Sequence, residues 1–131
     1  NMAAGKYNFA IEQGSTVDFT IKYKDSAGNA IDLTDYHARM QIRPDADSST
    51  LYAHLSSSTA ADGTGINMTP TDPDTLQVLP KSSGSLQVII SAQSSSAFTF
   101  GSAQYDLEIV SGSYVEKIIR GLVSLRKEVT R

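Results

Sequence analysis

The amino-acid sequence predicts an all-β protein whose strands stack as two sheets. In one segment after another, apolar residues recur at every second position, which places one set of side chains on a buried face and the other in water. Turn-forming Gly, Asn, Asp and Ser separate these segments, and no segment keeps a helical period. We therefore expect an antiparallel β-sandwich of about seven to nine strands, with a β-barrel as the alternative.

The first half of the chain contains several alternating segments. Their apolar positions are Tyr7, Phe9 and Ile11; Val17, Phe19, Ile21 and Tyr23; Ala38, Met40 and Ile42; and Leu51, Ala53 and Leu55. Asp25–Asn29 is dense in turn formers, so we expect the chain to reverse there. Pro44 should end the third segment, because proline has no N–H to donate to a strand ladder.

Residues 56–84 give the weakest pattern, because Ser, Thr, Asp, Gly and Pro dominate and apolar residues are few. We expect a long loop with one or two short strands in this part of the chain. Its apolar anchors should be Ile66, Met68, Leu76 and Val78.

The last third of the chain returns to alternation. Its apolar positions are Leu86, Val88 and Ile90; Tyr105, Leu107 and Ile109; and a long run from Tyr114 to about Leu125. Between the first two segments, Ser91–Ala97 suits a helical turn. In the final strand Ile118 and Ile119 are adjacent and Gly121 follows, so the alternation slips by one residue, as at a β-bulge.

Composition limits the cellular setting and the partners. The 131 residues have the length of one domain, and we expect a single domain over residues 1–131. The absence of cysteine excludes disulfides and suits a reducing cytoplasm. A net charge of −3 has the wrong sign for wrapping nucleic acid. Asn1–Gly5 lacks the basic and apolar parts of a signal peptide, and no apolar run has membrane-spanning length, so we expect a soluble chain without a membrane partner.

The two histidines, His37 and His54, fall on the polar phase of consecutive strands. They face each other across a hairpin if those strands pair in the matching register. Zinc takes three or four protein ligands, however, and the chain has no third histidine and no cysteine. We therefore expect solvated surface histidines rather than metal ligands.

Carboxylate pairs occur at Asp45/Asp47 and Asp72/Asp74 in loops and at Asp106/Glu108 on one face of a strand. The loop pairs lack the further acidic positions and the glycine of an EF-hand, and Asp, Pro and Ser are ordinary turn residues. The sequence contains no Gly-x-Ser-x-Gly elbow and no phosphate-cradling glycine loop. We expect no catalytic residues, no metal site and no cofactor, and hence no enzyme.

The segment Phe100–Leu107 resembles the tyrosine corner of immunoglobulin domains. In that corner, a tyrosine near the start of the penultimate strand donates a hydrogen bond to the backbone a few residues upstream. Tyr105 holds the tyrosine position, and Leu107 stands where antibody domains have a cysteine. A core tyrosine without a corner fits the same residues equally well.

Four segments carry a resemblance to a known family: Tyr7–Gly14, Asp32–Arg43, Tyr105–Ile109 and Arg120–Arg131. Together they resemble the small tail-associated proteins of tailed bacteriophages, and are similar to the immunoglobulin-like N-terminal domain of upper baseplate proteins. The resemblance implies an immunoglobulin-like sandwich and a structural role in the virion, in a tail, baseplate or connector assembled in the host cytoplasm. Implied partners are other tail or baseplate proteins and copies of the chain itself. The stretch Ser56–Gly84 departs from the pattern and is a candidate contact loop.

Sandwich edges are where another chain can add a strand, because their N–H and C=O groups are unpaired. We expect the edges at Lys6–Ile11 and Tyr114–Leu125. The candidate protein-contact residues on them are Tyr7, Phe9, Tyr114 and Leu122, with the last two on one outer face as an apolar patch.

The alternative function is a carbohydrate-binding sandwich module, indicated by polar loops and by tyrosines such as Tyr52. Such a module needs aromatic rings with free faces. The absence of tryptophan weighs against it.

Overall fold

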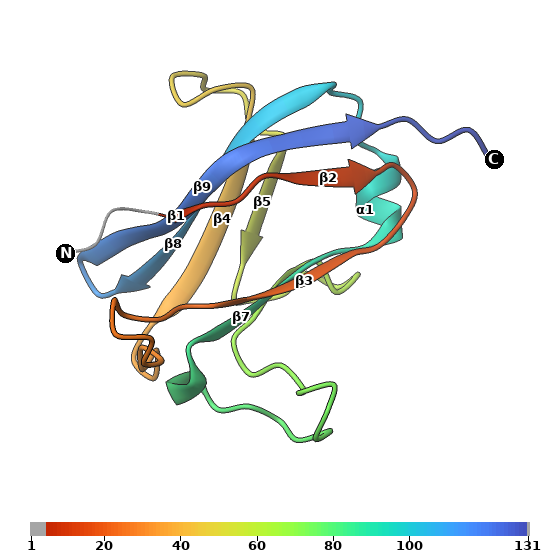
Figure 1. Cartoon of the computed structure of the whole chain (residues 1–131). Helices are drawn as coiled ribbons and strands as arrows, with labels where there is room; N and C mark the ends of the chain where they lie inside the picture. Colours follow the sequence, from red (N-terminus) through yellow and green to blue (C-terminus); the bar gives the residue numbers. More distant parts are fainter. Residues whose placement is uncertain (1–4, 131) are drawn as a thin grey trace.

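Two β-sheets face each other across one hydrophobic core in the computed structural model, which describes residues 5–130 (Figure 1). The larger sheet has the strand order β1-β9-β8-β4-β5, with β2 also on β9, and the smaller sheet has the order β3-β7-β6. This arrangement confirms the predicted sandwich. The larger sheet contains β1 (Gly5–Lys6), β2 (Phe9–Glu12), β4 (His37–Arg43), β5 (Ala53–Ser56), β8 (Ser102–Ser111) and β9 (Tyr114–Arg126). The smaller sheet contains β3 (Val17–Lys22), β6 (Gly65–Asn67) and β7 (Ser85–Ile90).

The alternating apolar residues form the core between the sheets. Fully buried side chains from both sheets meet there: Ile11, Met40, Ile42, Leu55, Leu107, Ile109 and Val123 from the larger sheet, and Ile66, Leu86, Val88 and Ile90 from the smaller one. Their removal from water is the main favourable contribution to folding. Pro44 follows directly after β4, as its missing N–H predicts.

The predicted helical turn is present as α1 (Ala92–Ser96). The Ser91 hydroxyl caps it by accepting a hydrogen bond from the Ser94 N–H at 3.0 Å. The buried Ser95 hydroxyl donates to the Ser15 carbonyl at 2.7 Å and accepts from the Gly14 N–H at 3.1 Å. These bonds attach α1 to the turn between β2 and β3, at one end of the sandwich.

The two N-terminal strands depart from the expected antiparallel pairing. β1 and β2 run parallel to β9, and all other strand pairs are antiparallel. β9 therefore lies between β8 and β1/β2. The expectation that Tyr114–Leu125 forms a sheet edge is wrong from Ile119 onward, where β1 and β2 flank β9. Within residues 5–130, Tyr114–Lys117 pairs only with β8, and Lys6–Ile11 lies at the edge as expected.

The predicted β-bulge in β9 is confirmed. Leu107 pairs with Ile119 and Glu108 pairs with Lys117, so Ile118 is the extra residue. Both Ile118 and Ile119 contact the core as a result. The bulge also reverses which residues of β9 face outward before and after it.

Tyr105 does not form a local tyrosine corner. Its hydroxyl donates at 2.5 Å to the carbonyl of Tyr7, which is 98 residues away in the chain and lies between β1 and β2. Gly121 of β9, the strand partner of Tyr105, makes room for this carbonyl, because a Cβ on Gly121 would lie 2.1 Å from the Tyr7 oxygen.

We predict that Gly121→Ala destabilises the protein by about 1–3 kcal/mol, because the new methyl group forces the Tyr7 carbonyl away from its place. Urea unfolding followed by circular dichroism measures the free energy. Gly101→Ala is the matched control, since a Cβ there meets nothing within 4 Å. It should change the free energy of unfolding by less than about 1 kcal/mol. Equal stability of the two variants would contradict the proposed role of Gly121.

Candidate functional site

Tyr7 and Phe9, two of the predicted contact residues, belong to an aromatic cluster beside the N-terminal edge. The Phe9 ring lies 4.9 Å from the Phe19 ring and 5.1 Å from the Tyr105 ring, measured between centroids. Tyr7 is 44% exposed and packs on Phe19 at 5.3 Å. Phe9 therefore bridges the two sheets, and Tyr7 presents the more accessible ring.

Tyr114 and Leu122 do not form one patch. Tyr114 pairs with Ser111 before the bulge, and its ring lies 6.3 Å from that of Tyr36, on the side of the larger sheet that faces the smaller one. Leu122 pairs with Gln104 after the bulge and points to the opposite, outer face. The expectation of a shared outer patch is wrong, because the extra residue Ile118 shifts the alternation, so that Tyr114 and Leu122 point to opposite faces of the sheet.

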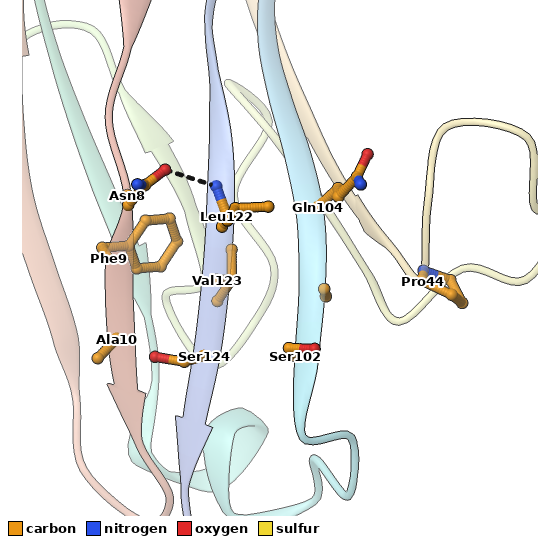
Figure 2. Close-up of a pocket in the computed structure, with 10 residues that line it drawn as sticks. Asn8, Phe9, Ala10, Pro44, Ser102, Gln104, Leu122, Val123 and Ser124 are labelled. Carbon is orange, nitrogen blue, oxygen red and sulfur yellow. Dashed lines mark hydrogen bonds between the residues drawn. The ribbon is translucent and has the colours of Figure 1, made fainter.

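A shallow depression of about 460 Å³ surrounds Leu122 (Figure 2). Its outer-face lining also includes Asn8, Pro44 and Gln104. Figure 2 shows the Asn8 side chain directed at β9, where its Oδ1 accepts a hydrogen bond from the Leu122 N–H at 2.8 Å. In the gap between β1 and β2, the Asn8 side chain thus replaces the backbone acceptor that a continuous strand would offer to Leu122. The Leu122 side chain itself is 55% exposed to solvent.

A row of charged side chains crosses the outer face of the larger sheet. Glu108 of β8 accepts hydrogen bonds from the Arg39 guanidinium of β4 and from the Lys117 ammonium of β9, the latter at 2.9 Å. Lys117 also bonds Asp106 at 3.1 Å. Asp106 and Glu108 therefore do share one face, as predicted, and they act there as partners of cations.

Burial raises the pKa of the Glu108 carboxyl, but its bonds to Lys117 and Arg39 outweigh burial and hold the pKa below its ordinary value. The bond to Glu108 raises the pKa of Lys117 in turn. Both groups therefore remain ionised near neutral pH and connect three adjacent strands.

His37 and His54 lie apart. His37 pairs with Val110 of β8, whereas His54 pairs with Gln41 and its Nδ1 lies 3.1 Å from the Gln41 amide nitrogen. Both side chains are exposed. No cluster of three or more potential metal ligands occurs within residues 5–130.

The loop aspartate pairs form turns. Asp45 Oδ1 accepts from the Asp47 N–H at 2.9 Å, and Asp72 Oδ1 accepts from the Asp74 N–H at 2.8 Å. Each carboxylate thereby fixes the backbone two residues onward, which is the usual role of Asp in a turn.

A second depression, of about 700 Å³, lies between β5 and α1 and contains a cluster of hydroxyl groups around Asp62. Asp62 Oδ2 accepts hydrogen bonds from the Ser91 and Ser94 hydroxyls, each at 2.6 Å. These bonds hold the pKa of Asp62 well below its ordinary value, with a smaller contribution from the Thr64 N–H. A carboxylate of such low basicity is a poor proton acceptor, and the cluster holds the loop before β6 onto the start of α1.

Tyr52 borders the same depression, and one face of its ring is covered. It stacks on Phe100 with centroids 4.6 Å apart and planes inclined by 13°. Among residues 5–130, the outer face of the larger sheet also carries no Phe or Tyr. The aromatic platform expected of a carbohydrate-binding module is therefore missing from that face.

Apart from Val129 near the C-terminus, the most exposed large apolar residues within residues 5–130 lie in a hairpin that the sequence pattern did not reveal. Of the four anchors expected in residues 56–84, Ile66 and Met68 are buried, but Leu76 and Val78 are 78% and 68% exposed. Thr71 and Val78 form an isolated β-bridge at the base of this hairpin, which spans residues 69–80. The signal that points to it is the pair of prolines at its ends with Pro73-Asp74 at its turn.

No known protein-family model and no curated protein matches this chain. Within residues 5–130, no helix has the length and apolar character needed to cross a bilayer.

We predict that Glu108→Gln destabilises the protein by about 1–3 kcal/mol at pH 7, because two cations lose a charged acceptor. A carboxyl whose pKa is lower in the folded chain stabilises the fold above its unfolded value, here 4.5, and this contribution disappears as pH falls through the folded pKa. The difference between the two proteins should therefore shrink below about pH 4.5 in urea titrations. The control is Glu12→Gln, which removes the exposed pair with Arg126 and should cost less than about 1 kcal/mol. A pH-independent difference would contradict the ionic role of Glu108.

Proposed function

We propose that the chain is a structural protein of a tailed-phage virion, in the tail, baseplate or connector, and that it acts through contacts with other protein chains. The observation that carries the proposal is the hairpin 69–80. It is ordered, it projects from the fold (Figure 1), and it exposes apolar side chains where a turn ordinarily has polar ones.

Backbone hydrogen bonds hold the hairpin in one conformation. The Asp72 N–H donates to the Gln77 carbonyl, the Leu76 N–H to the Asp72 carbonyl, and the Leu79 N–H to the Pro70 carbonyl, each at 2.8 Å. A segment that is already ordered loses little conformational entropy when it docks, which favours its use as a binding element.

Leu76 adopts a left-handed backbone conformation with φ of 59°. It is the one non-glycine residue with positive φ within residues 5–130. Side chains with a Cβ are strained in this conformation, and glycine or asparagine is the usual occupant. Leucine here costs stability and contributes little to the core, so its large exposed side chain is best explained by a contact outside the chain.

The strand order supports the immunoglobulin-like part of the proposal. An immunoglobulin sandwich joins strands B, E and D in one sheet and strands C, F and G in the other, and variable-type domains extend the second sheet next to C. The order β3-β7-β6 corresponds to the first sheet and the order β9-β8-β4-β5 to the second. Because sandwiches of this kind serve many functions, the order supports the fold and leaves the role to the exposed features.

Mass spectrometry of purified particles tests the proposed role. In particles of the virus that encodes the chain, we expect the protein at several copies per virion, and antibody labelling should place it on the tail. Absence from particles that are otherwise complete would overturn the proposal. A glycan array with the purified protein tests the carbohydrate alternative, and strong glycan binding together with absence from particles would favour it.

We predict that Leu76→Gly combined with Val78→Thr lowers incorporation into particles at least about fivefold, because apolar anchors at interface centres contribute more than about 1 kcal/mol each. The stability of the free protein should change by less than about 1 kcal/mol, since glycine relieves the strain at this position. Incorporation is measured with the chain supplied from a plasmid to a virus lacking it. Val129→Ser, which alters a 91% exposed apolar residue outside the hairpin, is the control and should incorporate normally.

A further inference from the structure

Charge is unevenly distributed along the chain. Between Arg43 and Lys81 there are five aspartates and no lysine or arginine. Two of these aspartates, Asp72 and Asp74, lie in the hairpin 69–80. Lys81, at the end of the hairpin, directs its ammonium group to the Tyr36 carbonyl at 2.8 Å, away from the hairpin tip. The tip is therefore both apolar and acidic.

The outer face of the larger sheet has the opposite character. A broad depression of about 1060 Å³ extends across it. Five cationic side chains border this depression, Lys6, Arg39, Arg43, Lys117 and Arg120, against three anionic ones, Asp45, Asp106 and Glu108. The depression thus has two surplus positive charges on a chain whose net charge is −3.

The surplus charge lies at the end of the depression nearest Leu122. Asp106 and Glu108 are occupied by Arg39 and Lys117. Lys6 of β1 and Arg120 of β9 are neighbours in the parallel pairing and take part in no salt bridge within residues 5–130. Leu122, two residues beyond Arg120, adds an exposed apolar side chain to the same face. The depression therefore combines an apolar contact with adjacent cations.

We propose that the hairpin 69–80 of one copy docks onto this outer face of a second copy, an inference that rests on the proposed assembly function. Leu76 and Val78 then contact Leu122 and the aliphatic stems of the arginines. Asp74 approaches Lys6 and Arg120. The occupant is a second copy because the chain itself carries an apolar, acidic protrusion complementary to the apolar, cationic depression.

The topology excludes this contact within one molecule. The hairpin connects β6 to β7 in the smaller sheet, whereas the docking face is the side of the larger sheet that points away from the smaller one (Figure 1). The contact joins two different surfaces, so it is heterologous. Repetition gives a ring if the rotation closes and an open stack if it does not.

A single hairpin buries little area, so each contact is weak by itself. In an assembly of several copies, the contacts act together and the effective concentration of each neighbour is high. We therefore expect concentration-dependent association of the purified protein, weakened by salt because the charges are exposed.

Charge reversal on each surface tests the pairing. Variant H carries Asp74→Lys and Gln77→Lys in the hairpin; Asp72 is retained because its carboxylate holds the turn. Variant F carries Lys6→Glu and Arg120→Glu on the outer face. Each variant alone presents two surfaces of like charge, so its self-association should weaken about tenfold or more relative to the original protein.

An equimolar mixture of variants H and F should recover association. The basic hairpin of H then meets the acidic face of F, and the acidic hairpin of F meets the basic face of H. Sedimentation velocity over a concentration series measures all four samples, and circular dichroism verifies that both variants are folded. The control variants Asp35→Lys and Lys22→Glu reverse exposed charges outside both surfaces and should associate like the original protein.

The contact is established if H and F each associate weakly and their mixture recovers association. The inference is overturned if the original protein stays monomeric throughout the series, or if H and F associate as well as the original protein. Either result leaves the proposed virion role intact when particles contain the chain. Absence of the chain from particles would instead remove the proposed role, whatever the sedimentation result.

Discussion

The hydrogen bond from the Tyr105 hydroxyl to the Tyr7 carbonyl is the contact on which the larger sheet depends. It holds the N-terminal strands parallel to β9 at the point where β1 and β2 are interrupted. Gly121 leaves the space for the inward carbonyl, and Asn8 supplies the acceptor that the backbone no longer offers to Leu122. Burial raises the pKa of the Tyr105 phenol, so it stays protonated and remains a donor at any physiological pH.

The attachment of β1 and β2 to β9 decides which surfaces of the larger sheet remain available for contacts with other chains. Because β1 and β2 cover one side of β9 from Ile119 onward, this part of the long C-terminal strand is internal and offers side chains rather than free backbone groups. Its outer residues continue the charged row of β4 and β8, in which Glu108 links Arg39 to Lys117. The larger sheet therefore presents a wide charged face on which Arg39 and Lys117 are paired with acidic side chains, whereas Lys6 and Arg120 take part in no salt bridge within residues 5–130.

Alternation in the sequence was enough to place most of the strands, the helical turn after β7 and the bulge at Ile118, because these depend on neighbouring residues. It did not give the bounds of β6 or the break between β1 and β2. It was insufficient for pairing, since a period of two identifies the face of a residue but not its partner strand. The contact between Tyr105 and Tyr7 spans 98 residues, so no local pattern reveals it. The sequence also does not distinguish an apolar residue that packs in the core from one exposed in a protruding hairpin. Leu76 and Val78 therefore read as core residues, although both are exposed.

The position of the acidic hairpin relative to the cationic face has a consequence for how copies can approach each other. Two copies aligned side by side place like charges together, acidic hairpin against acidic hairpin, and this arrangement is unfavourable. A head-to-tail approach brings opposite charges together and lets the exposed apolar residues leave water at the same time. The hydrogen-bonded turn of the hairpin holds Leu76 at an exposed position before any partner is present, which suits the proposed head-to-tail contact. The proposed contact therefore has one favoured orientation, and the hydrophobic core cluster contains no residue of the hairpin.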